Sequence, residues 1–293
     1  MTQMLDTQPK FWLPSMEENR YSVPTQQELT NIWQRENGTR ELLELDERIY
    51  NVAEIPDTPP AAYISVDLCE VVRHSGLSLL KMRGGTLEDM VVDDETNNFD
   101  YGSEINGWPE EIARTNRQKY LQEFMHHQVV EPVPFSDSIG AFLRKWRAQG
   151  AYVIANTSTL PGCEESTIEF LAQQYPGCFA GILLPRNYDG KGPVTKFDSL
   201  DEVRRMVDAT LTVTTRDKPI VAIDDAAHHA LAFDRADANV QAIMPEYKWN
   251  RGVDTVGSRI VRIAQGFGTV DAFIHADQYL QPKLASAEVT QAV

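Results

Sequence analysis

The stretch that most constrains the fold is AAYISVDLCEVV, residues 61–72. Five of the seven residues from Ala61 to Asp67 are apolar, and β-branched Ile64 and Val66 favour a strand that is buried on both faces. The apolar run ends at Asp67, and open α/β sheets bind their ligands at the carboxyl ends of such strands. A single aspartate at this place most often only ends a strand, so its meaning depends on the rest of the chain.

Two later apolar runs also end in polar side chains. They are residues 151–156, followed by Thr157 and Ser158, and residues 218–224, which end in Asp224 next to Asp225. Between and after these runs, the pattern predicts helices at 137–150, 163–174, 197–210 and from Ala226, with further strands at 179–185 and 239–245. This alternation predicts an α/β fold, a doubly wound, Rossmann-like parallel sheet with helices on both faces.

The remaining segments are predicted to surround this core. Thr25 and Glu28 have the spacing of a capping box, which opens a helix, and a second helix is predicted at 39–53. A mainly helical cap insertion after the first strand would act as a lid over that strand's end. The predicted divisions are an N-terminal helical extension at 1–60, a core at 61–72 and 131–250, the cap at 73–130, and a C-terminal helix (253–267) and tail within 251–293.

The composition is that of a globular protein with a strong acidic excess. There are 43 Asp and Glu residues against 27 Lys and Arg, a net charge of −16, which disfavours binding to nucleic acid polymers and anionic membranes. No secretory signal is visible, and no apolar run approaches the roughly 18 residues of a membrane helix. Cys69, Cys163 and Cys178 have neither zinc-site nor disulfide spacing. We therefore expect a cytoplasmic protein with no membrane partner.

The polar residues at the three strand ends are expected to converge on one crevice, as strand ends do in a doubly wound sheet. Carboxylates at Asp67, Asp224 and Asp225 would suit Mg²⁺, a hard cation that prefers oxygen ligands. A nearby hydroxyl and a lysine would hold phosphate oxygens and neutralise charge during phosphoryl transfer. Lys191 and Lys196 are the candidate lysines, because both precede the helix that leads to the third strand.

Over about residues 61–245, these short motifs resemble those of the haloacid dehalogenase (HAD) superfamily of phosphohydrolases. The resemblance implies that Asp67 attacks phosphorus to form an aspartyl-phosphate, with Val71 at the fifth position of the first motif. The second motif is a phosphate-binding hydroxyl, matched by Thr157 or Ser158. The third is a lysine, matched by Lys196 in preference to Lys191. The fourth is a Mg²⁺-binding acidic pair, matched by Asp224 and Asp225.

The resemblance also extends to the layout of the chain. The insertion at 73–130 resembles the family's C1 cap, which selects substrate. The Thr-Ser second motif and the Asp-Asp fourth motif are similar to those of the deoxyribonucleotidase branch. Within the acidic pair, the resemblance makes Asp225 the better Mg²⁺ ligand.

Two positions depart from the family's pattern. The family's phosphatases have an acid–base aspartate two residues after the nucleophile, where this chain has Cys69. A thiol with an ordinary pKa of about 8.5 replaces a carboxylic acid poorly, and loss of this help costs on the order of 10²–10⁴ in rate. The Cys69 backbone carbonyl could still bind Mg²⁺, whereas the side chain of Glu70 is expected to point away. His228 and His229 follow the acidic pair. Imidazole suits Zn²⁺ or Fe better than Mg²⁺, so the histidines are expected to open a helix at the mouth of the site in preference to binding a metal.

The leading hypothesis is a Mg²⁺-dependent hydrolase of a small phosphomonoester, with nucleotides among the candidates, that acts through Asp67, Cys69 and Lys196. The alternative is a HAD-fold protein that has lost efficient turnover and serves as a binding or structural subunit. The N-terminal extension is expected to pack on the core or on a second copy in a homo-oligomer. Lys248 and Arg251, after the last strand, are expected either to touch substrate or to be ordinary surface.

Overall fold

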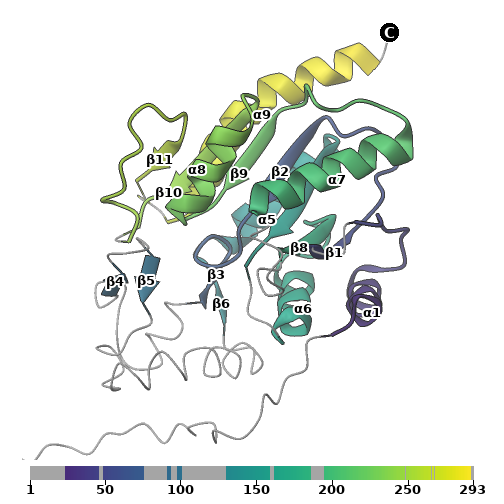
Figure 1. Ribbon diagram of the computed structural model, residues 1–293, viewed down its shortest axis with the longest axis horizontal. Helices are drawn as coiled ribbons and strands as arrows, with labels where there is room; N and C mark the ends of the chain where they lie inside the picture. Colours follow the sequence, from purple (N-terminus) through teal and green to yellow (C-terminus); the bar gives the residue numbers. More distant parts are fainter. Residues whose placement is uncertain are drawn as a thin grey trace, which may run out of the picture.

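A seven-stranded sheet forms the centre of the molecule in a computed structural model (Figure 1). The structure describes residues 24–45, 49–75, 91–93, 98–100, 130–158, 162–185, 195–247, 249–264, 266 and 268–291. The strands, in their order across the sheet, are β1 (Ile49–Ala53), β8 (Gly181–Pro185), β7 (Ala151–Asn156), β2 (Ala62–Val66), β9 (Ile220–Ile223), β10 (Val240–Pro245) and β11 (Val261–Ile263). All neighbouring pairs are parallel except β1 and β8. The predicted α/β fold is confirmed.

The order of the strands makes β2 the point where the winding of the sheet reverses. From β2 the chain builds outward through β7 to β8, and it then returns to add β9, β10 and β11 on the other side. Val66, at the end of β2, pairs with Ala155 of β7 and Ile223 of β9, so these strands end close together. In doubly wound sheets such a switch point is where ligands bind.

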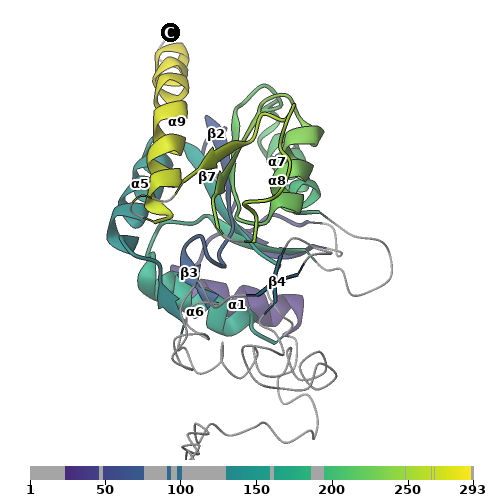
Figure 2. The ribbon, with the colours of Figure 1, turned by 90° about the vertical axis from the view of Figure 1, so that its left-hand side faces the viewer.

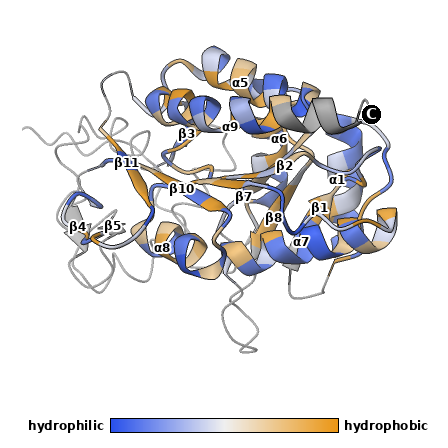
Figure 3. Cartoon of the chain, turned by 90° about the horizontal axis from the view of Figure 1, so that it is seen from above, coloured by the Kyte–Doolittle hydropathy of each residue, from blue (hydrophilic) through white to orange (hydrophobic). Residues whose placement is uncertain are grey.

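Helices cover both faces of the sheet (Figure 2). One face carries α1 (Gln26–Asn37), α5 (Ser136–Ala148), α6 (Glu164–Gln174) and α9 (Val270–Gln291), and the other carries α7 (Lys196–Leu211) and α8 (Ala227–Ala236). Side chains of β2 alternate between the two cores, with Ile64 and Val66 in the first and Tyr63 in the second. Seen from above, apolar strands lie between helices whose outer faces are polar (Figure 3).

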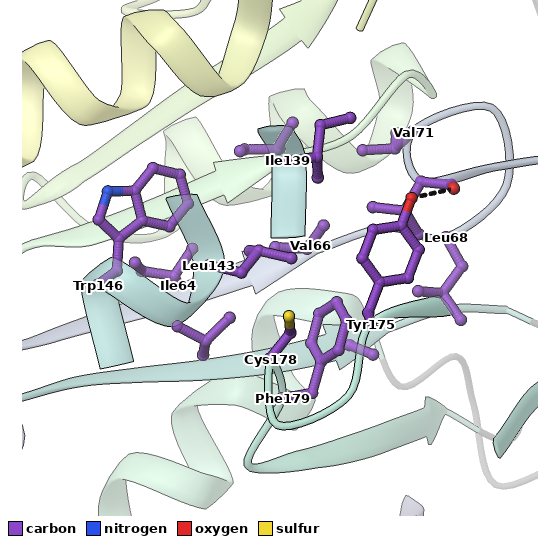
Figure 4. Close-up of a cluster of buried hydrophobic side chains, with 14 of the residues drawn as sticks. Ile64, Val66, Leu68, Val71, Ile139, Leu143, Trp146, Tyr175, Cys178 and Phe179 are labelled. Carbon is purple, nitrogen blue, oxygen red and sulfur yellow. Dashed lines mark hydrogen bonds between the residues drawn. The ribbon is translucent and has the colours of Figure 1, made fainter. Parts of the chain in front are cut away.

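The loop after β2 is fixed by apolar packing. Leu68 and Val71 are fully buried against the same core as Ile139 and Leu143 of α5 (Figure 4). Tyr175 donates a hydrogen bond of 2.7 Å to the carbonyl oxygen of Val72, drawn as a dashed line in that view. Burial of each such aliphatic side chain contributes roughly 1.5–3 kcal/mol. The loop that carries Asp67 is therefore a rigid part of the core.

The N-terminal segment joins the sheet instead of forming two helices. The capping box at Thr25 and Glu28 is confirmed, and it opens α1. The helix predicted at 39–53 is wrong, because Ile49–Ala53 is a strand that pairs antiparallel with β8. The leucines of this segment fit a helical period, but β8 offers an unpaired edge, and hydrogen bonds to that edge override local preference. Trp33 of α1 is buried in the core of the same chain.

The C-terminal prediction is also wrong in its details. Residues 253–260 form turns, Val261–Ile263 forms β11 beside β10, and the helix is α9, which begins later, at Val270. Gly257 has a φ of +82°, a conformation that interrupts a helix and favours glycine. The β-branched residues that follow, Val261 and Ile263, pair with the edge of β10 in strand β11.

Most described residues of the predicted cap lie in short strands, one of which pairs with a strand just beyond the predicted end of the cap. β3 (Arg73–His74) pairs antiparallel with β6 (Glu131–Pro132) at the base of the insertion, and β4 (Val91–Asp93) pairs with β5 (Asn98–Asp100). The rest of the insertion lies outside the described residues. Of the helices in the described part of the chain, none is long and apolar enough to cross a membrane.

Candidate active site

Two neighbouring strands place three carboxylates at the switch point of the sheet. Asp67 is the first residue after β2, and Asp224 and Asp225 are the first two after β9. The backbone N–H of Asp67 donates to the carbonyl oxygen of Ile223 over 2.9 Å, which ties the two strand ends together. One carboxylate oxygen from each of the three aspartates lies within 4.8 Å of the others, and all three residues are buried.

Lys196 lies between two of these carboxylates. Its Nζ is 2.7 Å from Oδ1 of Asp67 and 2.7 Å from Oδ2 of Asp224, and the residue is only 3% exposed. Burial by itself lowers the pKa of this lysine, but Asp224 and Asp67 outweigh it and raise the pKa above its ordinary value. Lys196 therefore remains an ammonium group.

The position of Lys196 follows from the start of α7. Thr195 caps the helix, and Asp198 completes a capping box with it, so Lys196 is the first helical residue. The Asn156 side chain at the end of β7 donates a 2.7 Å hydrogen bond to the Lys196 carbonyl oxygen. Asn156 is a supporting residue that sequence reasoning missed. The alternative lysine, Lys191, lies outside the described residues.

With all three aspartates ionised, the charge at this cluster would be unbalanced, because three carboxylates would face one ammonium group. Burial, together with the neighbouring carboxylates of Asp67 and Asp224, raises the pKa of Asp225 well above its ordinary range. A divalent cation among these oxygens would offset that repulsion, and an all-oxygen donor set is the kind that Mg²⁺ prefers. The residues present thus fit a Mg²⁺ site.

Asp225 is held by the segment that follows β10, in a role that the sequence did not predict. Trp249 Nε1 donates to Oδ2 of Asp225 over 2.9 Å, and Asn250 Nδ2 donates to its carbonyl oxygen over 2.7 Å. Of the two alternatives for Arg251, substrate contact or ordinary surface, the structure shows the second, because Arg251 pairs at the surface with Glu246. Lys248 lies outside the described residues. The only sequence signal was the position of this segment directly after the last predicted strand.

The two candidate phosphate-binding hydroxyls differ in their surroundings. Thr157 is the first residue after β7 and is buried, whereas Ser158 is exposed. The backbone N–H of Thr157 donates to the carbonyl oxygen of Leu183 over 3.0 Å, which holds it beside β8. Within the described residues, neither hydroxyl forms a side-chain hydrogen bond, so both are available to donate a hydrogen bond to a ligand.

The Cys69 thiol lies outside the carboxylate cluster. Its Sγ accepts hydrogen bonds from Ser75 Oγ at 3.2 Å and from Arg73 Nη2 at 3.6 Å. Burial, and to a lesser degree the charge of Asp67, raises the pKa of the thiol despite the opposing effect of Arg73. Cys69 is therefore a neutral thiol, unsuited to exchange protons as a carboxylate would.

Glu70 is directed into the protein. It is fully buried, and its Oε2 lies 2.9 Å from Nδ1 of His74. Its φ of +56° places its backbone in the left-handed region, which residues other than glycine adopt at a cost of roughly 1–2 kcal/mol. The turn after Asp67 is consequently strained and must be held by its surroundings.

His228 and His229 lie in the first turn of α8, so the prediction that they open a helix is confirmed. His229 is partly buried, and burial, with the positive charge of Lys196, lowers its pKa to about 2. Neither histidine belongs to the group of possible metal ligands found among the described residues.

Similar solved structures include several hydrolases of one superfamily. A predicted phosphatase from Clostridium acetobutylicum is 18% identical, covers 76% of this chain and 100% of its own, and has a TM-score of 0.44. A haloacid dehalogenase-like hydrolase from Streptococcus pneumoniae is 12% identical, covering 75% and 98%, with a TM-score of 0.45. A β-phosphoglucomutase from Clostridium difficile is 14% identical, covering 79% and 100%, with a TM-score of 0.42. At these identities and TM-scores no activity can be transferred to this chain. No protein-family model and no curated protein matches it.

Proposed function

We propose that this protein is a HAD-type, Mg²⁺-dependent hydrolase of a small phosphomonoester, with Asp67 as the nucleophile. The observation that carries the proposal is the buried group of Asp67, Asp224 and Asp225 around Lys196 at the switch point of the sheet. Buried charges are costly, so a folded chain retains unbalanced ones chiefly where they bind or react.

The proposed reaction proceeds in two steps. A carboxylate oxygen of Asp67 attacks phosphorus, the ester P–O bond breaks, and the leaving oxygen takes up a proton from solvent water. Water then attacks the phosphorus of the aspartyl-phosphate, which releases phosphate and restores the carboxylate. Lys196 would neutralise charge on the phosphoryl oxygens, and Thr157 or Ser158 would donate a hydrogen bond to them.

The metal ligands would be Asp67 and Asp225, with Asp224 beside them and the Cys69 backbone carbonyl as a further candidate. Mg²⁺, when bound, would supply additional positive charge next to the transferring phosphoryl group. The side chain of Asp224 already accepts hydrogen bonds from Lys196 and from the backbone N–H of Ala226. Asp225 therefore remains the preferred ligand of the acidic pair.

The neutral thiol at Cys69 favours a second candidate function. Without a carboxylic acid at this position, proton transfer to the leaving group would be slow. The protein would then act as a weak phosphatase that needs a good leaving group, or as a binding or structural subunit with no useful turnover. The net charge of −16 supports the further proposal that neither a nucleic acid polymer nor a membrane is its partner.

The test is hydrolysis of an aryl phosphate and an alkyl phosphate with Mg²⁺ by wild type, Asp67→Asn and Cys69→Asp, with Cys69→Ser as a neutral control. We expect wild type to cleave the aryl ester slowly and Asp67→Asn to lose that activity. Cys69→Asp should raise the rate by about 10²–10⁴, more for the alkyl ester, because its leaving group needs the proton more.

The outcomes separate the two candidates. Activity that survives Asp67→Asn would overturn the proposed nucleophile. A wild type that cleaves neither ester, together with activity in Cys69→Asp but not in Cys69→Ser, would establish the impaired site and favour the binding function.

A further inference from the structure

The loop after β10 touches the candidate site at two separate points. Trp249 donates to Oδ2 of Asp225 over 2.9 Å, and the Tyr247 hydroxyl donates to the carbonyl oxygen of Glu70 over 2.6 Å. The two aromatic rings are stacked, with centroids 4.3 Å apart and planes 9° from parallel. Both residues are buried, at 1% and 5% exposure.

The first contact fixes the orientation of a carboxylate. An indole group has one N–H and can only donate, so its bond to one oxygen of Asp225 restricts rotation of the carboxylate plane. Asn250 holds the same residue through the backbone, since its Nδ2 donates to the carbonyl oxygens of Asp225 and Pro245 over 2.7 and 2.8 Å. Groups that hold metal ligands in this way commonly change metal affinity by 10–100-fold when they are removed.

The second contact fixes the turn that follows the nucleophile. Glu70 lies three residues after Asp67 in the strained left-handed conformation described above. The hydrogen bond from Tyr247 anchors the carbonyl oxygen of that turn. Because Tyr247 is stacked on Trp249, one rigid pair of rings joins the turn beside Asp67 to the carboxylate of Asp225.

We propose that Tyr247 and Trp249 are positioning residues that set the affinity of this site for its divalent cation. The inference rests on the cation site of the proposed function. It adds that cation affinity depends on a loop whose aromatic side chains contact Asp225 and the turn that follows Asp67.

The chain contains a matched control for the indole contact. Trp146 of α5 donates to Oδ1 of Asp277 over 2.8 Å and is fully buried, but that pair joins α5 to α9, away from the three site aspartates. Trp146→Phe thus removes the same kind of hydrogen bond, from a buried indole to a carboxylate, although Asp277 is also paired with Lys145. It should alter stability without changing cation affinity.

The experiment measures binding of Mn²⁺ alone by the loss of its free-ion electron paramagnetic resonance signal. Wild type is compared with Trp249→Phe, Tyr247→Phe, Trp146→Phe and Asp225→Asn, and thermal unfolding shows that each variant is folded. Phenylalanine keeps an aromatic ring for the stack and removes only the donor. We expect Trp249→Phe to bind about 10–100-fold more weakly, Tyr247→Phe to bind more weakly by a smaller factor, and Trp146→Phe to match wild type.

A second measurement needs only the wild-type fold. With ¹⁵N-labelled tryptophan, the indole N–H resonance of Trp249 should shift as Mg²⁺ is added and follow the same binding curve, whereas that of Trp146 should stay still. The resonances can be assigned by replacing the other four tryptophans one at a time.

The results separate this inference from the proposed function. If wild type binds Mn²⁺, Asp225→Asn does not, and Trp249→Phe binds as wild type does, the positioning role is overturned and the metal site stands. A Trp249 resonance that does not shift at Mg²⁺ concentrations that saturate the site would likewise overturn the positioning role. If wild type binds no Mn²⁺, the cation site and the inference both fall.

Discussion

An ammonium group at 3% exposure is costly to bury, and at Lys196 that cost is offset by two carboxylates at 2.7 Å. The same contacts that stabilise the lysine bring Asp67 and Asp224 close to each other. Removal of Lys196 would leave these carboxylates buried with less opposing charge. Its loss should consequently cost far more than the loss of a surface lysine.

We therefore expect Lys196→Met to lower the free energy of unfolding by about 3–5 kcal/mol in the presence of a chelator. Lys145→Met is the matched control, because its Nζ is 2.8 Å from Asp277 but its side chain is 43% exposed. Exposed pairs of this kind contribute about 0–1 kcal/mol. Urea denaturation measures both, and equal small losses would show that the Lys196 pairs are not a major source of stability.

Glu54 allows a test of a single buried carboxyl group. It accepts hydrogen bonds from Trp33 and Arg147, yet burial raises its pKa above the ordinary value of 4.5. Because the pKa of Glu54 is higher in the folded state, its carboxyl group stabilises the fold in its protonated form. This contribution is fully present below pH 4.5 and is lost as the pH rises through the folded pKa.

The free energy of unfolding of Glu54→Gln minus that of wild type should accordingly be more positive at pH 7 than at pH 4.5. Its slope should be at most about 1.4 kcal/mol per pH unit. Urea midpoints of the two proteins across this range measure the difference. Glu165→Gln, at an exposed glutamate that pairs with Arg35, is the control for loss of a carboxylate at the surface. If Glu54→Gln instead gains stability relative to wild type as the pH falls from 7 to 4.5, the expected direction is contradicted.

At the scale of elements, the segment before the core completes the sheet. β1 pairs with β8 along its full length from Ile49 to Ala53. The pairing depends on a small residue, because a Cβ atom at Gly181 would lie 2.2 Å from the carbonyl oxygen of Val52 and 2.8 Å from Cα of Ala53. Both are backbone atoms, which cannot move aside without opening the strand pair.

Gly181→Ala should thus destabilise the protein by about 1–3 kcal/mol, the usual cost of overpacking. It should also expose the connection between α1 and β2 to limited proteolysis. Gly252→Ala is the control, since a Cβ there would meet no atom within 4 Å. Unchanged stability and protease resistance in Gly181→Ala would mean that β1 is not needed to complete the sheet.

At the scale of the whole molecule, the acidic excess and the carboxylates of the candidate site both destabilise the folded state through repulsion between negative charges. A net charge of −16 repels itself in the compact state, and three of the carboxylates meet at one buried point. Any salt will screen the diffuse charge, but only a cation bound at the site will relieve the local repulsion. The two effects can be separated by comparing Mg²⁺ with Na⁺.

We expect Mg²⁺ at 100 times its dissociation constant to raise the free energy of unfolding by about 2.7 kcal/mol. NaCl at equal ionic strength should give a smaller rise, and Asp225→Asn should lose the part specific to Mg²⁺. Thermal melts with and without a chelator measure the effect. The same rise with NaCl, or in Asp225→Asn, would mean that Mg²⁺ acts only by screening.

Local sequence was a good guide wherever the pattern was strongly periodic and the element lies inside the core. The strand at 151–156 was predicted to the residue, and the capping box at Thr25 was identified from spacing alone. Both errors, at 39–53 and 253–267, lie where a strand pairs with the edge of a sheet. The partner strand that decides such a segment lies far away in the sequence, so local periodicity cannot reveal it.

By itself, the sequence indicated the fold class and the candidates Asp67, Asp224 and Asp225, because strand ends in a doubly wound sheet can converge, whereas the choice of Lys196 over Lys191 came from the resemblance to the HAD superfamily. Only the tertiary structure brought Lys196 to two carboxylates and placed Trp249 against Asp225. Those contacts depend on side chains from separate loops, and their distances are fixed by the packing of the whole core. The Cys69 thiol was visible in the sequence, but the rise of its pKa above the ordinary value follows from a burial that only the folded chain provides.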